Sequence, residues 1–246
     1  MGPLAQAGGH DLNYVALPGL LSLSAHCGDR PIVPPTAIGD AGGALGLAFG
    51  MACVLFEARI SGRGQVVDAV IVDVVAMLGS IAQWVRGNGQ LDGPPPSPLH
   101  DSPFCDVYAC ADGSFITLGA MEPQFYALLL DKLGLVDVNP EAQYDVTELP
   151  LLKLRLTVIF ASQPRARRCE PLEGSDVCFA PVLSVAEAAA HPQNVEQGTY
   201  CASDGGGLQV AAAPRLLSPK AELTDSDAAP RRTARIAVFR HAIGAK

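Results

Sequence analysis

The chain has 246 residues, of which 49% are hydrophobic and 17% charged, and its formal net charge at pH 7 is −8. These values describe a globular protein with enough apolar surface for a core, and they argue against a disordered chain. The negative charge argues against nucleic acid or an anionic membrane surface as the main partner. No stretch reaches the ~20 uninterrupted apolar residues of a membrane span. The apolar segment 44–55 contains glycine, and we expect it to be a buried helix.

The cysteines are scattered and never form a Cys-x-x-Cys pair, which favours neither a zinc site nor a disulfide framework. There are seven of them: Cys27, Cys53, Cys105, Cys110, Cys169, Cys178 and Cys201. We expect reduced thiols that mostly act as small core residues, and no bound metal. The first residues also lack the basic region and apolar run of a signal peptide, so we expect a cytoplasmic protein.

Two helical stretches are predicted near the start of the chain. The first covers about residues 5–26 and is broken at Pro18. The second covers about residues 41–59, and Gly62 ends it because glycine readily adopts the left-handed conformation that follows many helices.

The glycine run at 42–46 favours close packing of this helix on another backbone. A phosphate-binding loop is disfavoured because no Lys-Ser/Thr pair follows. Residues 65–70 are predicted to form a short strand, and residues 72–85 a buried helix. The proline- and glycine-rich segment 86–103 is predicted to be a linker.

A second unit is predicted from residue 104 onward. Residues 105–109 and 114–118 flank Gly113, which is typical of a β-hairpin. Further elements are expected as helices over 124–133, 151–162 and 185–190 and as strands over 177–183 and 205–210.

His10 and Asp40 suit proton-transfer chemistry. A histidine and a carboxylate can serve as base and acid, and Gly39-Asp40 before further glycines suits a helix start that faces a ligand. The plainer alternatives are a capping or core histidine at His10 and an N-cap at Asp40. The other histidines lie in connections or in the tail, where structural or solvated roles are expected: His26, His100, His191 and His241.

Five sequence blocks occur in order: 9–14 (Gly-His-Asp-Leu-Asn-Tyr), 38–43 (Ile-Gly-Asp-Ala-Gly-Gly), 62–68, 119–126 and 173–183. Together they resemble the alpha-methylacyl-CoA racemases of the class III CoA-transferase superfamily, and the resemblance extends to about residue 216.

The resemblance implies an α/β fold. The residues present would form part of a Rossmann-like large domain at 1–85, with the catalytic residues, and a linker at 86–103. A small α+β domain would follow at 104–216, with a poorly defined tail at 217–246.

The resemblance also implies racemisation of 2-methylacyl-CoA thioesters without a metal or redox cofactor. The alpha proton is weakly acidic, so the reaction needs a base on one face, an acid on the other and donors to the enolate oxygen. His10 and Asp40 would be the two groups, and they would exchange roles in the reverse direction. Glu122 would hold the imidazole and fix its tautomer, although it could instead be only a helix-dipole charge. The Asp11 backbone amide would be the oxyanion donor.

A binding role is implied for the whole first block, which would line the pocket beside the thioester and pantetheine: Gly9, His10, Asp11, Leu12, Asn13 and Tyr14. The expected partner is a 2-methyl-branched acyl-CoA of fatty-acid metabolism, with no nucleic acid and no membrane. The family forms interlocked dimers, so we expect a homodimer in which Glu122 acts in the other subunit's site.

The chain also departs from the family. Family members carry about a hundred further residues before the first block, so we expect an N-terminally truncated large domain with an exposed sheet edge and exposed apolar helix faces. The acidic residue and tryptophan that the family shows near 165–169 are also absent. Two alternatives stay open. One is a class III CoA-transferase with Asp40 as a covalent acyl carrier, and the other is an inactive truncated fragment.

Overall fold

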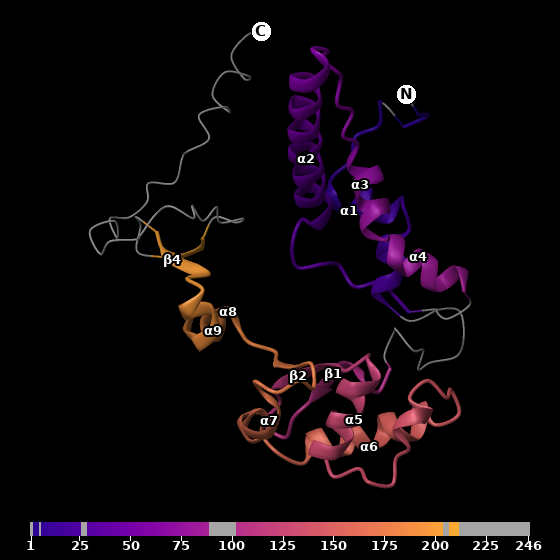
Figure 1. Cartoon of the computed structure of the whole chain (residues 1–246), viewed down its shortest axis with the longest axis vertical. Helices are drawn as coiled ribbons and strands as arrows, with labels where there is room; N and C mark the ends of the chain where they lie inside the picture. The colour runs from indigo at the N-terminus through magenta and orange to yellow at the C-terminus, as the bar shows by residue number, and fades with distance from the viewer. Residues whose placement is uncertain (1, 5, 26–28, 89–101, 204–206, 212–246) are drawn as a thin grey trace. The chain divides into compact units, whose positions relative to one another are not determined.

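The computed structural model describes residues 2–4, 6–25, 29–88, 102–203 and 207–211 (Figure 1). Contacts divide the chain into two compact units, Met1–Val182 and Leu183–Lys246. This division falls inside the predicted small domain at 104–216, and the predicted tail at 217–246 lies outside the described residues. Helices and strands are both present, which confirms the α/β class.

In the described residues between 2 and 88, all of the regular structure is helical. The elements are α1 (Asp11–Ala16), the 3₁₀ helix η1 (Leu20–Ser24), α2 (Ile38–Ser61), α3 (Ile71–Leu78) and α4 (Ser80–Gly87). The predicted end of α2 is confirmed, because Gly62 has φ +72° and the Gly62 N–H donates to the Ala58 carbonyl. Glycine adopts this left-handed conformation without the steric cost that a Cβ would add.

Helix α2 packs on α3 through its glycines. A Cβ on Gly43 would lie 2.7 Å from Cγ1 of Ile71, and a Cβ on Gly46 would lie 2.6 Å from Cγ2 of Val74. Both distances are shorter than any ordinary Cβ contact, so a larger residue would push the helices apart. The predicted packing role of the glycine run at 42–46 is therefore confirmed.

The variant Gly46→Ala is expected to lower the free energy of unfolding by about 1–3 kcal/mol, because the added methyl group must displace Val74. Urea unfolding followed by circular dichroism measures this. Gly87→Ala is the matched control, since nothing lies within 4 Å of a Cβ at Gly87 and alanine is the better helix former. If Gly46→Ala unfolds at the wild-type urea concentration, the α2–α3 contact is looser than the structure shows.

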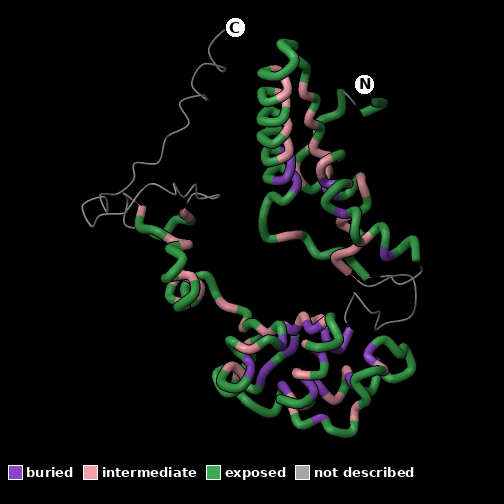
Figure 2. The backbone as a smooth tube through the Cα atoms, in the orientation of Figure 1, coloured by how far each residue is buried: buried purple, intermediate pink, exposed green. Residues whose placement is uncertain are grey.

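The other faces of α2 are exposed, so the predicted burial of 44–55 is wrong (Figure 2). Leu45 and Phe56 are each 70% exposed, and Phe49 and Ile60 each 73%. They follow one another at helical spacing, and the described residues cover mainly the glycine face. This exposure agrees with the separate expectation of uncovered apolar helix faces. By length and composition alone α2 is also long enough to cross a membrane, with 6% of its most apolar window buried, and that is weak support for a span.

Two further predictions for this part are wrong. Residues 65–70 form no strand, because the described residues between 2 and 88 offer no neighbouring strand with which their backbone could pair. The predicted single helix at 72–85 is two helices separated at Gly79, where Leu20 packs closely on the glycine. The predicted burial of this helical segment is also wrong, since the Trp84 side chain is exposed.

Residues 102–182 contain a three-stranded antiparallel sheet of order β1-β2-β3. Its strands are β1 (Cys105–Ala109), β2 (Phe115–Gly119) and β3 (Phe179–Pro181). The hairpin prediction is confirmed: Cys105 pairs with Gly119 and Ala109 with Phe115, and Gly113 takes φ +75° in the turn. The third strand lies within the predicted 177–183.

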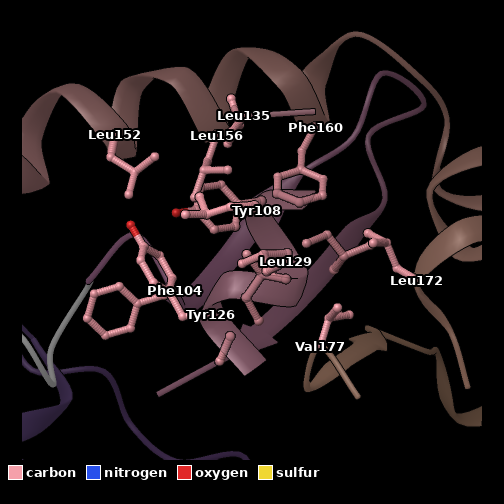
Figure 3. Close-up of a cluster of buried hydrophobic side chains, with 14 of the residues drawn as sticks. Phe104, Tyr108, Tyr126, Leu129, Leu135, Leu152, Leu156, Phe160, Leu172 and Val177 are labelled. Atoms are coloured by element: carbon pink, nitrogen blue, oxygen red, sulfur yellow. The ribbon is translucent and has the colours of Figure 1, made fainter. Parts of the chain in front are cut away.

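Four helical elements accompany this sheet: α5 (Pro123–Lys132), the 3₁₀ helix η2 (Pro140–Ala142), α6 (Leu149–Ala161) and α7 (Arg165–Leu172). The predictions at 124–133 and 151–162 are confirmed by α5 and α6, whereas α7 was not predicted. Side chains from α6 cover the hairpin, with Phe160 beside Tyr108 and Leu156 next to them (Figure 3). These residues belong to one buried apolar cluster.

The second unit contains α8 (Val185–Ala190), α9 (Pro192–Glu196) and an antiparallel pair of strands, β4 (Tyr200–Ala202) and β5 (Leu208–Val210). The predicted helix at 185–190 is confirmed and begins with a capping box. Ser184 Oγ accepts the Glu187 N–H, and the Glu187 carboxylate accepts the Ser184 N–H.

Candidate functional site

His10 stands at the start of α1 with its side chain exposed. It is the N-cap residue, with extended backbone (φ −128°, ψ 174°). The His10 N–H donates to Oδ1 of Asn13 at 3.0 Å, and the His10 carbonyl accepts the Asn13 N–H at 2.8 Å. These bonds fix the backbone at the helix start.

The Tyr14 side chain also bonds to the backbone just before α1. Its hydroxyl donates to the Gly9 carbonyl at 3.0 Å, and a Cβ on Gly9 would lie 3.0–3.1 Å from the tip of the Tyr14 ring. The lack of a side chain at position 9 therefore leaves room for the Tyr14 ring. The Asn13 amide and the Tyr14 hydroxyl thus bond to the protein's own backbone. His10, Leu12 and Asn13 are the exposed residues of the first block.

The carboxylate of Asp11 joins α1 to α2. Its Oδ1 accepts the backbone N–H of Asp40 at 2.8 Å. Ala37 is the N-cap of α2 and Asp40 is its third residue, so the N-cap alternative for Asp40 is wrong. Instead, Asp11 satisfies one of the amides at the start of α2, where the helix dipole favours negative charge.

Gly39 makes this close approach possible. Gly39 is buried, and a Cβ there would lie 2.9 Å from Oδ1 of Asp11 and 3.1 Å from Cγ2 of Val15. A side chain at 39 would therefore displace the carboxylate that binds the Asp40 amide. The sequence showed the Gly39-Asp40 pair, but the reason for the glycine and the structural role of the Asp11 side chain became visible only in the fold.

The structure thus brings the His10-Asp11 turn next to the first turn of α2, as the prediction of a shared site requires. Both the His10 and the Asp40 side chains are exposed. The Asp11 N–H has no acceptor among the residues that the structure describes. A base, a carboxyl group and a backbone donor therefore stand on two joined helix starts, which is a suitable set for proton transfer beside a developing negative charge.

Glu122 is the N-cap of α5, just before Pro123. Its side chain is exposed and makes no capping hydrogen bond, so the carboxylate is open to another partner. Burial, and then the charge of Glu122, raise the pKa of the Tyr144 phenol and the pKa of the Cys178 thiol. Glu122 is carried by the 102–182 part of the chain, and its predicted contact with His10 stays a prediction.

Comparisons with known proteins place these residues in a family context. The model of CoA-transferase family III matches residues 1–234. The human alpha-methylacyl-CoA racemase is 36% identical over 230 residues, and the mouse enzyme 37% identical over 227. These matches cover 89% and 88% of this chain, and the chain spans 58% of each of those proteins.

A solved structure shows the same fold. The protein Rv3272 of Mycobacterium tuberculosis matches with a TM-score of 0.69 at 18% sequence identity, over 88% of this chain and 59% of that one. The likeness confirms the arrangement of helices and strands as one that an experimentally determined structure also has.

Proposed function

The chain belongs to the CoA-transferase family III, and on that premise we propose that it racemises 2-methylacyl-CoA thioesters. His10 removes or returns the alpha proton on one face of the substrate, and Asp40 acts on the opposite face. The proposal is supported most directly by the bond between Asp11 Oδ1 and the Asp40 N–H, which ties together the two turns that carry these groups. The identity with two alpha-methylacyl-CoA racemases supports the substrate class.

Each step follows from the weak acidity of the alpha proton. When one group removes it, negative charge develops on the thioester oxygen, and the Asp11 N–H donates to that oxygen. The other group then delivers a proton to the opposite face, which inverts the carbon. This step leaves the protonation states of His10 and Asp40 exchanged, which is the state from which the reverse direction starts. The proposal requires no metal or redox cofactor. It includes a cytoplasmic homodimer, in which Glu122 of one subunit orients the His10 imidazole of the other.

A CoA-transferase would use Asp40 differently, as a nucleophile that forms a covalent acyl intermediate. The two mechanisms are separated by incubating the chain with an acyl-CoA, adding hydroxylamine and analysing peptides that contain residue 40 by mass spectrometry. A racemase leaves Asp40 unmodified, and a control with Asp40→Asn reports the background. A hydroxamate at Asp40 would contradict the racemase proposal and favour the transferase.

A further inference from the structure

The backbone that leads into Glu122 is held by side chains from a segment about twenty residues later. Nε2 of Gln143 donates to the carbonyls of Ala120 and Met121, at 3.0 Å each. The hydroxyl of Tyr144 donates to the same Met121 carbonyl at 2.6 Å. Two side chains thus converge on the peptide group between Met121 and Glu122.

The preceding peptide groups are bonded as well. The Gly119 N–H donates to the Cys178 carbonyl at 2.8 Å, and the Ala120 N–H donates to the Phe104 carbonyl at 2.8 Å. The end of β2 and the loop after it, residues 119–121, are therefore bonded on their N–H side to residues that precede β3 and β1. On their carbonyl side they are bonded to Gln143 and Tyr144.

Gln143 is a buried polar residue, with 3% of its surface exposed. Its amide orientation follows from its surroundings, because the reversed amide would place Oε1 against two carbonyl oxygens. In the correct orientation Oε1 is buried without a partner among the described residues. A buried, unsatisfied oxygen is costly. An apolar side chain would avoid that cost, so what the glutamine contributes is its pair of bonds to the loop.

Tyr144 combines packing with a polar contact. Its ring meets Phe104 edge to face, with centroids 5.3 Å apart and an interplanar angle of 81°. This contact directs the hydroxyl to the Met121 carbonyl. Glu122 lies close enough for its charge to raise the pKa of the phenol, after the larger effect of burial. The ring and the hydroxyl can therefore be separated by one substitution, Tyr144→Phe.

We propose that Gln143 and Tyr144 are positioning residues that fix the direction of the Glu122 side chain by clamping the Met121 carbonyl. The inference rests on the proposed function, since it requires that Glu122 acts on His10. Rotation of the Met121–Glu122 peptide would swing the Cα–Cβ bond of Glu122 and move its carboxylate. A misplacement of about 1 Å in such a group can cost about 10²-fold in rate.

Tyr144→Phe tests the clamp because it removes the hydroxyl and keeps the ring on Phe104. We expect kcat to fall about tenfold or more while KM changes less than about twofold, because the lost orientation acts on the chemical step. Gln143→Met, of similar volume but without donors, is expected to act in the same direction. Thr157→Val is the matched control, because it also removes a hydroxyl that donates to a carbonyl. That carbonyl belongs to Lys153, at 2.8 Å within helix α6.

A second measurement does not depend on activity. Amide hydrogen exchange over residues 119–126 is expected to speed up about tenfold or more in Tyr144→Phe and to stay at the wild-type rate in Thr157→Val. Unchanged exchange in Tyr144→Phe and Gln143→Met would overturn the clamp whatever the activity. Faster exchange with unchanged kcat would also overturn the inference, because the loop would then not position a working group. A wild-type chain without racemase activity would instead end the proposed function, while the exchange data would still decide on the clamp.

Discussion

Replacing His10 or Asp40 by alanine is expected to abolish racemisation, with a loss of at least about 10²-fold for each variant, the lower end of what general acid–base groups contribute. Inversion requires removal of a proton on one face and delivery on the other, so the loss of either group stops the reaction. The measurement is the rate at which a single enantiomer of a 2-methylacyl-CoA loses optical purity. Wild-type rates in both variants would contradict the assignment of the two groups.

The controls separate chemistry from folding. Both side chains are exposed, so their removal is expected to leave the melting temperature close to that of the wild type. Asp73→Ala is the matched control, because Asp73 is an exposed carboxylate in the first turn of α3, as Asp40 is in the first turn of α2. A loss of rate in Asp73→Ala equal to that in Asp40→Ala would show that the effect is not specific to the site.

Phe160→Ala is expected to lower the free energy of unfolding by about 3–5 kcal/mol, because it leaves a cavity in the core. Phe160 is fully buried, and its ring lies 5.1 Å from the Tyr108 ring and 5.7 Å from the guanidinium of Arg168. Urea unfolding provides the measurement. Val158→Ala on the same helix is the control, because Val158 is 62% exposed and should change stability by less than about 0.5 kcal/mol. Similar midpoints for the two variants would contradict the core shown in Figure 3.

Local signals predicted the elements whose causes are local. The hairpin at 105–119 and the end of α5 depend on Gly113 and Gly134, which take φ +75° and +68°. The end of α2 depends in the same way on Gly62. These conformations follow from the residue type itself, so a single sequence suffices to predict them.

Elements that depend on distant partners were not predictable in this way. Helix α7 carries several arginines and Pro171, a poor helical pattern, and tertiary bonds hold it. The Arg165 N–H donates to the Asp112 carboxylate at 3.1 Å, and the Arg168 guanidinium donates to the Ile159 carbonyl. The predicted strand at 65–70 failed for the opposite reason, since its valine-rich segment finds no strand to pair with in the described residues. Composition likewise predicted an apolar α2 but could not show which of its faces would be covered.

In the candidate site, too, features with local causes were predictable and contacts between distant residues were not. Sequence motifs led to the prediction of His10, Asp40 and Glu122 as site residues, because residue types and a family resemblance are properties of the sequence. They did not show that the Asp11 carboxylate binds the Asp40 amide or that Gly39 makes room for it, since these contacts join residues 29 and 28 positions apart. Gln143 and Tyr144 were missed because neither belongs to a motif. Their only signal is a polar pair that follows a 3₁₀ turn, and that signal gains meaning only next to the Met121 carbonyl.

Deuterium uptake by one pure enantiomer of a 2-methylacyl-CoA, incubated with the wild-type chain in D₂O, tests the central claim most directly. Two groups on opposite faces predict that deuterium enters the alpha position and that the configuration at this carbon is progressively lost. An alpha carbon that keeps both its hydrogen and its configuration would show that this chain does not carry out the chemistry proposed for His10 and Asp40.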